Sequence, residues 1–184
     1  MDNWEMKGKP ALIIMHMQNS IVAEDGSLAF FGFAKATTES GIIPRQQKLL
    51  NEFREKKLPI IYVVATHPST FTVPAYGKFW EALASLTVNQ AGSKDVEIIS
   101  ELVPQTNEPV ISNWPIGCFS NSKLEQLLID NGAETLVLMG VATDIVVLTT
   151  TLQAISLFYS AIVVKDCCTT INQKTHDVVL NRNL

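Results

Sequence analysis

The sequence predicts a three-layer α/β/α sandwich built on a mostly parallel, about six-stranded central sheet of the Rossmann-like kind. Short apolar runs alternate along the chain with helical stripes, which indicates strands joined by crossover helices. The runs are continuous and show no alternation of polar and apolar residues, as expected for strands covered on both faces. A length of 184 residues fits a single domain over residues 1–184.

The first half of the chain contains two of these strands. Residues 11–15 form one apolar run and residues 59–65 form the next. Between them, an apolar stripe at helical spacing follows Pro44. Lys56 and Lys57 suit the end of this helix, where cations meet the negative end of the helix dipole.

Residues 66–94 show no clear periodicity. They hold four aromatic residues, namely Phe71, Tyr76, Phe79 and Trp80. This content favours an ordered excursion over a disordered linker. Together with the low content of charged residues, it predicts a homo-oligomer with some of these aromatic side chains at or near the interface.

The second half of the chain repeats the alternation. Residues 109–112, 135–139 and 161–164 predict three more strands, the last ending at Lys165-Asp166. A helical stripe ends at Gly132, and a second helix runs to about Phe158 with Thr143 or Asp144 as its cap. The last helix is expected to start near Asn172.

Composition limits the class of protein. Hydrophobic residues make up 47% of the chain, charged residues 17%, and the net charge is −4, which argues against nucleic acid as a partner. No apolar run approaches about 18 residues, and no signal peptide is evident, so we expect no membrane association. The three cysteines, two of them adjacent, indicate a reduced set and a cytoplasmic protein.

Polar residues follow three of the predicted strands. Residues 13–20 read I-I-M-H-M-Q-N-S, residues 138–147 read L-M-G-V-A-T-D-I-V-V, and residues 112–114 read S-N-W. Ligands of open α/β sheets bind beyond the carboxyl ends of the strands. These segments resemble the isochorismatase-like (cysteine hydrolase) superfamily, whose patterns read V-I-D-M-Q-N-D-F, K-x-R-x-S-A-F and G-V-A-T-N-I-C-V. The resemblance extends from about residue 9 to residue 180 and implies an isochorismatase-like fold.

The catalytic triad of that family is altered in this chain. The family uses an Asp, a Lys and a Cys, and the matching positions hold His16, Asn113 and Val146. In the family, the thiol attacks from the start of a helix, the Asp takes its proton, and the Lys orients or stabilises charge. A valine side chain has no lone pair for this attack, and an asparagine has no charge.

His16 has two readings. It can act as an acid or a base near neutral pH, or it can be a hydrogen-bonded histidine at the place of a former catalytic Asp.

The resemblance also implies a pocket around these positions. Its expected wall includes Gln18, Trp114, Cys118, Val141, Ala142 and Thr143. Cys118 matches the alanine of S-A-F and is either a rebuilt nucleophile or a small buried apolar residue. In the family, the Val-Ala type peptide bond is cis and directs backbone N–H groups into the pocket. This backbone arrangement is expected to be retained although the cysteine nucleophile is lost.

No metal site and no cofactor are expected. His16, His67 and Asp144 lie at strand ends or a helix start, where their side chains would be able to converge. However, the Asp and two His that hold a metal in nicotinamidase-type members lack a match at the corresponding spacing.

Three functions remain open from the sequence. The first is a non-canonical or inactive family member that keeps a small-molecule pocket. The second is an active hydrolase of the cysteine-less isochorismatase type, with His16 as general acid or base. The third is a structural subunit that pairs with an active paralogue. Family resemblance makes the chain a hydrolase homologue, but we expect no cysteine-hydrolase activity.

Overall fold

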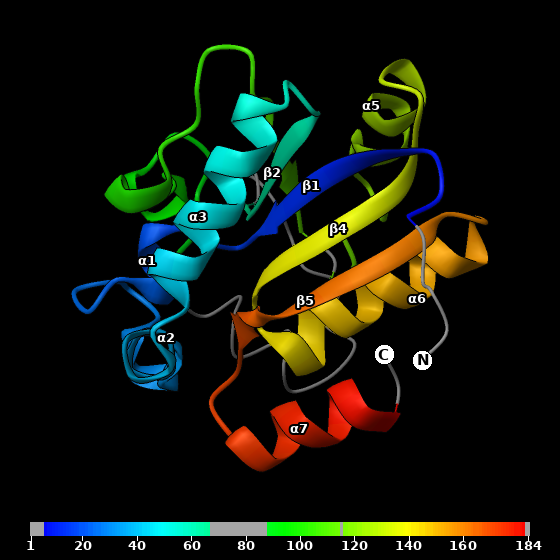
Figure 1. Cartoon of the computed structure of the whole chain (residues 1–184). Coiled ribbons are helices and arrows are strands. Elements are labelled where there is room, and N and C mark those ends of the chain that lie inside the picture. The colour runs from blue at the N-terminus through cyan, green and yellow to red at the C-terminus, as the bar shows by residue number, and fades with distance from the viewer. Residues whose placement is uncertain (1–5, 67–87, 115, 183–184) are drawn as a thin grey trace.

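A computed structural model describes residues 6–66, 88–114 and 116–182 of the chain. Five parallel strands form one sheet in the order β3-β2-β1-β4-β5, with helices on both faces (Figure 1). The predicted α/β class and parallel sheet are confirmed, with five strands in the described residues where about six were expected. The strands are β1 (Lys9–Met15), β2 (Ile60–Ala65), β3 (Val110–Asn113), β4 (Ala133–Val141) and β5 (Ser160–Thr169).

Helices and helical turns connect the strands. Those before β3 are α1 (Asn19–Val22), η1 (Ala29–Phe31), α2 (Phe33–Ser40), α3 (Ile42–Glu55), η2 (Lys94–Val96) and η3 (Ser100–Leu102). Those after β3 are α5 (Leu124–Asp130), the π-helical turn η4 (Thr143–Val147), α6 (Leu148–Ser156) and α7 (Gln173–Arg182). In the described part of the chain, no helix has both the length and the apolar character needed to cross a membrane.

The register of the sheet places the functional segments at one edge. Met15 at the end of β1 is aligned with Val63 of β2 and with Gly140 of β4. Ala65 of β2 is aligned with Asn113 of β3. The residues that follow these positions therefore emerge together at the carboxyl ends of the strands, as the sequence predicts.

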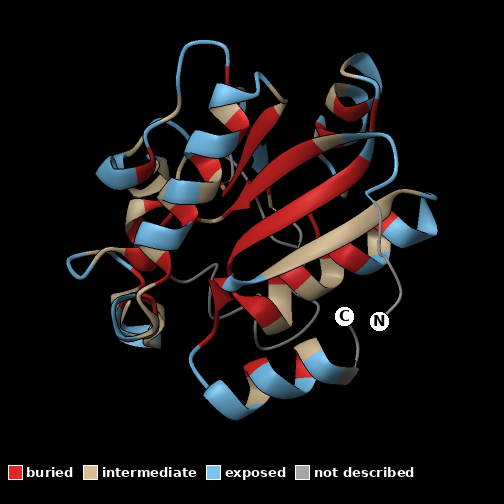
Figure 2. Cartoon of the chain, in the orientation of Figure 1, coloured by how far each residue is buried: buried red, intermediate tan, exposed pale blue. Residues whose placement is uncertain are grey.

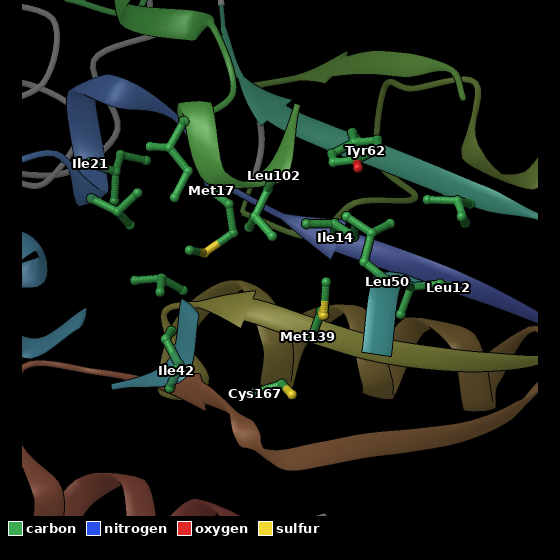
Figure 3. Packing of buried hydrophobic residues seen from close by; sticks show 14 of the residues in the cluster. Leu12, Ile14, Met17, Ile21, Ile42, Leu50, Tyr62, Leu102, Met139 and Cys167 are labelled. Carbon is green, nitrogen blue, oxygen red and sulfur yellow. The ribbon is translucent and has the colours of Figure 1, made fainter. Parts of the chain in front are cut away.

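The side chains of the central strands alternate between two apolar layers. Leu12 and Ile14 of β1 pack with Ile42 and Leu50 of α3 on one face (Figure 3). Ala11, Ile13 and Met15 belong to the opposite layer, with Leu124 and Leu128 of α5 and Ala154 of α6. Strands β1 and β4 are buried along most of their length (Figure 2), which explains their continuous apolar sequences.

The predicted end of the strand at residues 161–164 is wrong. Strand β5 does not end at Lys165-Asp166 but continues to Thr169, with buried Cys167 and Cys168 after the exposed pair. The register with β4 shifts between Leu138 and Gly140, so the polar pair lies at an irregularity of an edge strand and does not end it.

The predicted cap of the helix after β4 is also wrong. Ala142 is the N-cap residue, and no side chain caps the turn. The Thr143 hydroxyl instead hydrogen-bonds with His176, and the Asp144 carboxylate accepts a hydrogen bond from Thr170. By contrast, Asn172 does cap α7, because its side-chain oxygen accepts the backbone N–H of Thr175 at 3.1 Å.

Candidate functional site

A cavity of about 270 Å³ opens at the carboxyl ends of the central strands. Strand ends contribute His16, Ala65 and Trp114, and the segment after β4 contributes Val141, Ala142, Ile145 and Val146. The segment from α1 to α2 supplies Ile21, Leu28, Phe31 and Phe33. Asn89, Ile116 and Ile171 complete the described lining. As far as the structure describes it, the side-chain lining is apolar apart from His16, Asn89 and the indole nitrogen of Trp114.

His16 is held by Asn113 at the edge of the cavity. The His16 Nε2 lies 3.2 Å from Asn113 Oδ1, and Asn113 Nδ2 donates to the Gly117 carbonyl at 3.2 Å. Because the amide N–H₂ of Asn113 faces a carbonyl, its oxygen faces the histidine, so Nε2 carries the proton of the neutral ring. Asn113 thus positions His16 without lining the cavity itself.

The environment keeps His16 uncharged at neutral pH. Burial lowers the pKa of His16 to about 4, and the hydrogen bond with Asn113 opposes this only in part. The residue also has a left-handed backbone, with φ of 56°, a conformation that histidine adopts more readily than most residues. This kink follows directly on β1 and lets His16 leave the line of the strand.

Val146 occupies the first helical turn after β4. It lies in η4 and is buried, with its side chain in the cavity wall. The preceding Val141–Ala142 peptide bond is cis, which agrees with the expectation from the resemblance. The structure therefore brings His16 and Val146 to one cavity, with Asn113 bonded to His16 beside it.

Gln18 lies behind the wall as a structural link. Its Oε1 accepts the Ala65 N–H at 2.7 Å, and its Nε2 donates to the Ala65 carbonyl at 3.0 Å and to Asn89 Oδ1 at 3.1 Å. Ser20 donates to the same Asn89 oxygen at 2.6 Å. These bonds fix the end of β2 and Asn89 relative to α1.

Cys118 does not line the cavity. It is fully buried in the apolar layer that faces α5 and α6, and its backbone N–H donates to Thr150 Oγ1. Burial raises the pKa of the Cys118 thiol to about 12, so almost none of it is thiolate at neutral pH. The reading of Cys118 as a small buried apolar residue is therefore the better one. Cys167 and Cys168 are also buried, with raised pKa values of about 11 and 12.

The remaining expected residues lie elsewhere. Thr143 is buried, and its Oγ1 lies 2.9 Å from Nδ1 of His176. Asp144 is held by Thr170 at 2.6 Å. His67 and the aromatic residues at 71, 76, 79 and 80 lie outside the described residues. Within the described ranges, no group of three His, Cys, Asp or Glu residues is placed to hold a metal ion.

Sequence reasoning missed the part of the wall that comes from residues 21–33. Phe31 and Phe33 belong to short helices without a recognisable motif, and Leu28 directly precedes the first of them. The cluster Phe30-Phe31-Gly32-Phe33 was the available signal, because several aromatic side chains in one short segment need an apolar surface to cover. Ile171, just beyond β5, carried no signal of its own.

The sheet order and the cavity at its carboxyl edge define an open, parallel α/β protein. The family model for the isochorismatase domain matches residues 10–183, so this chain belongs to the isochorismatase family. Among curated relatives, the chain is similar to the uncharacterized isochorismatase family protein YwoC of Bacillus subtilis (strain 168), with 28% identity over 179 residues. That match covers 94% of this chain and 84% of the relative.

Solved structures show the same fold. The chain is similar to N-carbamoylsarcosine amidase from Thermoplasma acidophilum, with a TM-score of 0.76 and 27% identity, covering 96% of this chain and 93% of that one. An isochorismatase family protein from Desulfovibrio vulgaris gives a TM-score of 0.81 at 24% identity, covering 94% and 88% of the two chains. The latter match supports the fold alone.

Proposed function

We propose that this isochorismatase-family protein binds a small molecule in the cavity at the carboxyl ends of its strands and does not perform the thiol chemistry of the cysteine hydrolases. One observation carries the proposal. At the position that resembles the family nucleophile stands Val146, whose aliphatic side chain forms part of the cavity wall. No thiol, amine or carboxylate lies among the described lining residues.

The neighbouring residues support the same conclusion. A cysteine hydrolase needs a group that takes the thiol proton and a cation that stabilises charge. His16 and Asn113 bond to each other here, and both are uncharged at neutral pH. The candidate for a rebuilt nucleophile, Cys118, is buried in the core and is not among the described lining residues.

The cysteine-less isochorismatase mechanism, with His16 as general acid, receives less support. A general acid must carry its proton at the working pH. With a pKa of about 4, only roughly one His16 in a thousand is protonated at pH 7. His16 is therefore better suited to accept one hydrogen bond from a ligand than to protonate it.

The test combines turnover, covalent labelling and restoration. Amides are included in the substrate panel because one relative is an amidase, and isochorismate is included because of the family. The unmodified protein is expected to show no turnover and no acyl adduct by intact mass. Val146→Cys alone is expected to remain inactive, whereas the triple variant His16→Asp, Asn113→Lys, Val146→Cys should form an adduct with an activated amide.

Binding is measured separately from chemistry. In a thermal-shift screen, a compound that binds only the native state raises the melting temperature. Val146→Phe, which fills part of the cavity, should abolish that shift, while Cys118→Ser should leave it intact because Cys118 lies outside the cavity. Turnover by the unmodified protein, or an adduct that maps to Cys118, would refute the proposal.

A further inference from the structure

The described part of the cavity wall has no charge to offer a ligand. None of its fourteen described residues carries a charged side chain at neutral pH, since His16 is neutral. The carboxylate nearest in sequence to Val146, that of Asp144, is bonded to Thr170. A carboxylate or ammonium group that entered this cavity would lose its hydration and find no counter-charge among these fourteen residues.

One side-chain acceptor among the described lining residues remains available. His16 uses Nε2 in its bond with Asn113, so Nδ1 keeps its lone pair. Within the described part of the chain, the bond of Nε2 with Asn113 is the one hydrogen bond of the imidazole ring, so Nδ1 makes none. The side-chain oxygen of Asn89, by contrast, already accepts bonds from Gln18 and Ser20. A ligand therefore meets one acceptor on His16.

The rest of the wall favours a ring. Phe31, Phe33 and Trp114 provide flat aromatic surfaces, and branched aliphatic side chains surround them. A volume of about 270 Å³ is near the lower end of the range for small-molecule pockets, which suits one ring or two fused rings.

We propose that the cavity binds an uncharged, ring-containing small molecule with one hydrogen-bond donor, and that this donor is directed to Nδ1 of His16. The inference rests on the proposed function, because it names the ligand class of the same cavity. It adds two requirements to that function, a neutral ligand and a donor group.

Three matched probes test these requirements: indole, 1-methylindole and indole-3-carboxylate. Calorimetry and thermal shift on the full chain are expected to show binding of indole. Without the donor, 1-methylindole should bind about 3- to 10-fold more weakly, as expected for one neutral hydrogen bond. Indole-3-carboxylate should bind at least about 30-fold more weakly, because its charge stays unpaired.

Two variants separate the donor requirement from the charge requirement. His16→Leu should remove the difference between indole and 1-methylindole while both still bind. Ile171→Arg places a cation at the exposed rim, where Ile171 is 57% exposed, and should admit indole-3-carboxylate. Val178→Arg, on α7 and 49% exposed but not part of the lining, is the matched control and should not change selectivity.

The outcomes test the ligand class separately from the proposed function, which is small-molecule binding without thiol chemistry. If the unmodified protein binds indole-3-carboxylate as tightly as indole, or if Ile171→Arg fails to admit the carboxylate, the ligand class is wrong while a binding cavity stands. If none of the three probes binds, the ligand class is again overturned. The proposed function is then judged by the wider ligand screen and the turnover assays.

Discussion

At the scale of single residues, the site differs from the family pattern in charge. The resemblance places an Asp, a Lys and a Cys where this chain has His16, Asn113 and Val146. The structure turns the first two into a neutral hydrogen-bonded pair and the third into a part of an apolar wall. Where the resemblance implies charged groups, this chain therefore has a neutral hydrogen-bonded pair and an aliphatic side chain.

The titration of His16 tests this view of the site. Its C–H resonances in NMR should titrate near pH 4, whereas those of an exposed histidine titrate near pH 6.5. The chain has three histidines, and the spectrum of His16→Asn identifies the resonance by its absence. A midpoint above about 6 would contradict the buried, neutral state.

The same lowered pKa makes stability depend on pH. Between pH 6.5 and 4, the unfolded chain binds the proton of His16 more readily than the native protein does. His16 should therefore not reduce the free energy of unfolding above pH 6.5, and this free energy should fall as the pH drops from 6.5 towards 4. Denaturant unfolding across this range should show a steeper fall for the unmodified protein than for His16→Asn.

At the scale of elements, the sequence predicts strands better than it predicts their ends. The apolar runs of β1, β2 and β4 are continuous because both faces are covered, and this signal is local. The end of β5 depends on pairing with β4, which local polarity at Lys165-Asp166 does not report.

The candidate site divides in the same way between predictable and hidden parts. His16 and Val146 follow strands and match motifs, so their place at the carboxyl edge is predictable. Phe31, Phe33 and Ile171 reach the cavity only through the packing of η1, α2 and the segment after β5, which no local pattern encodes.

A glycine near the end of β4 allows this strand to approach the backbone of β1 closely beside the cavity. Gly140 has φ of 137°, and a Cβ atom there would lie 2.1 Å from the backbone oxygen of Met15. Gly140→Ala should lower the free energy of unfolding by at least about 3 kcal/mol, because neither backbone can move away easily. Gly132→Ala is the control, with φ of 61° and no atom within 4 Å, and should cost about 1 to 2 kcal/mol. Equal losses in chemical denaturation would contradict the steric argument.

At the scale of the whole molecule, low charge content and exposed apolar side chains predict self-association. The aromatic residues between 66 and 94 that first suggested an interface lie outside the described residues. Among the described ones, Leu152 and Ile155 lie one helical turn apart on α6 and are 51% and 55% exposed.

We expect light scattering at micromolar concentration to report a homodimer or a larger closed assembly. The double variant Leu152→Ser, Ile155→Ser should shift the protein toward a monomer near 20.3 kDa. Ile129→Ser on α5, also at an exposed apolar residue, serves as the control. A monomer for the unmodified protein would refute the prediction.

An ion pair lies at the end of the sheet opposite the proposed binding cavity. Away from the cavity, Arg54 of α3 forms a two-pronged ion pair with buried Glu108, with both N–O distances at 2.7 Å. Glu108 also accepts the backbone N–H of Gln105. Burial alone would raise the pKa of Glu108, but the bonds from Arg54 and Gln105 outweigh it and lower that pKa.

Removal of this pair should weaken the fold and leave ligand binding unchanged. Glu108→Gln is expected to lower the free energy of unfolding by about 2 to 3 kcal/mol, because it leaves the partly buried Arg54 without its counter-charge. Glu52→Gln breaks the exposed pair with Lys56 and should cost less than about 0.5 kcal/mol. Since Glu108 is not part of the cavity wall, the affinity of folded Glu108→Gln for indole should equal that of the unmodified protein. A change in affinity with no change in stability would show that the two ends of the sheet are coupled and not independent.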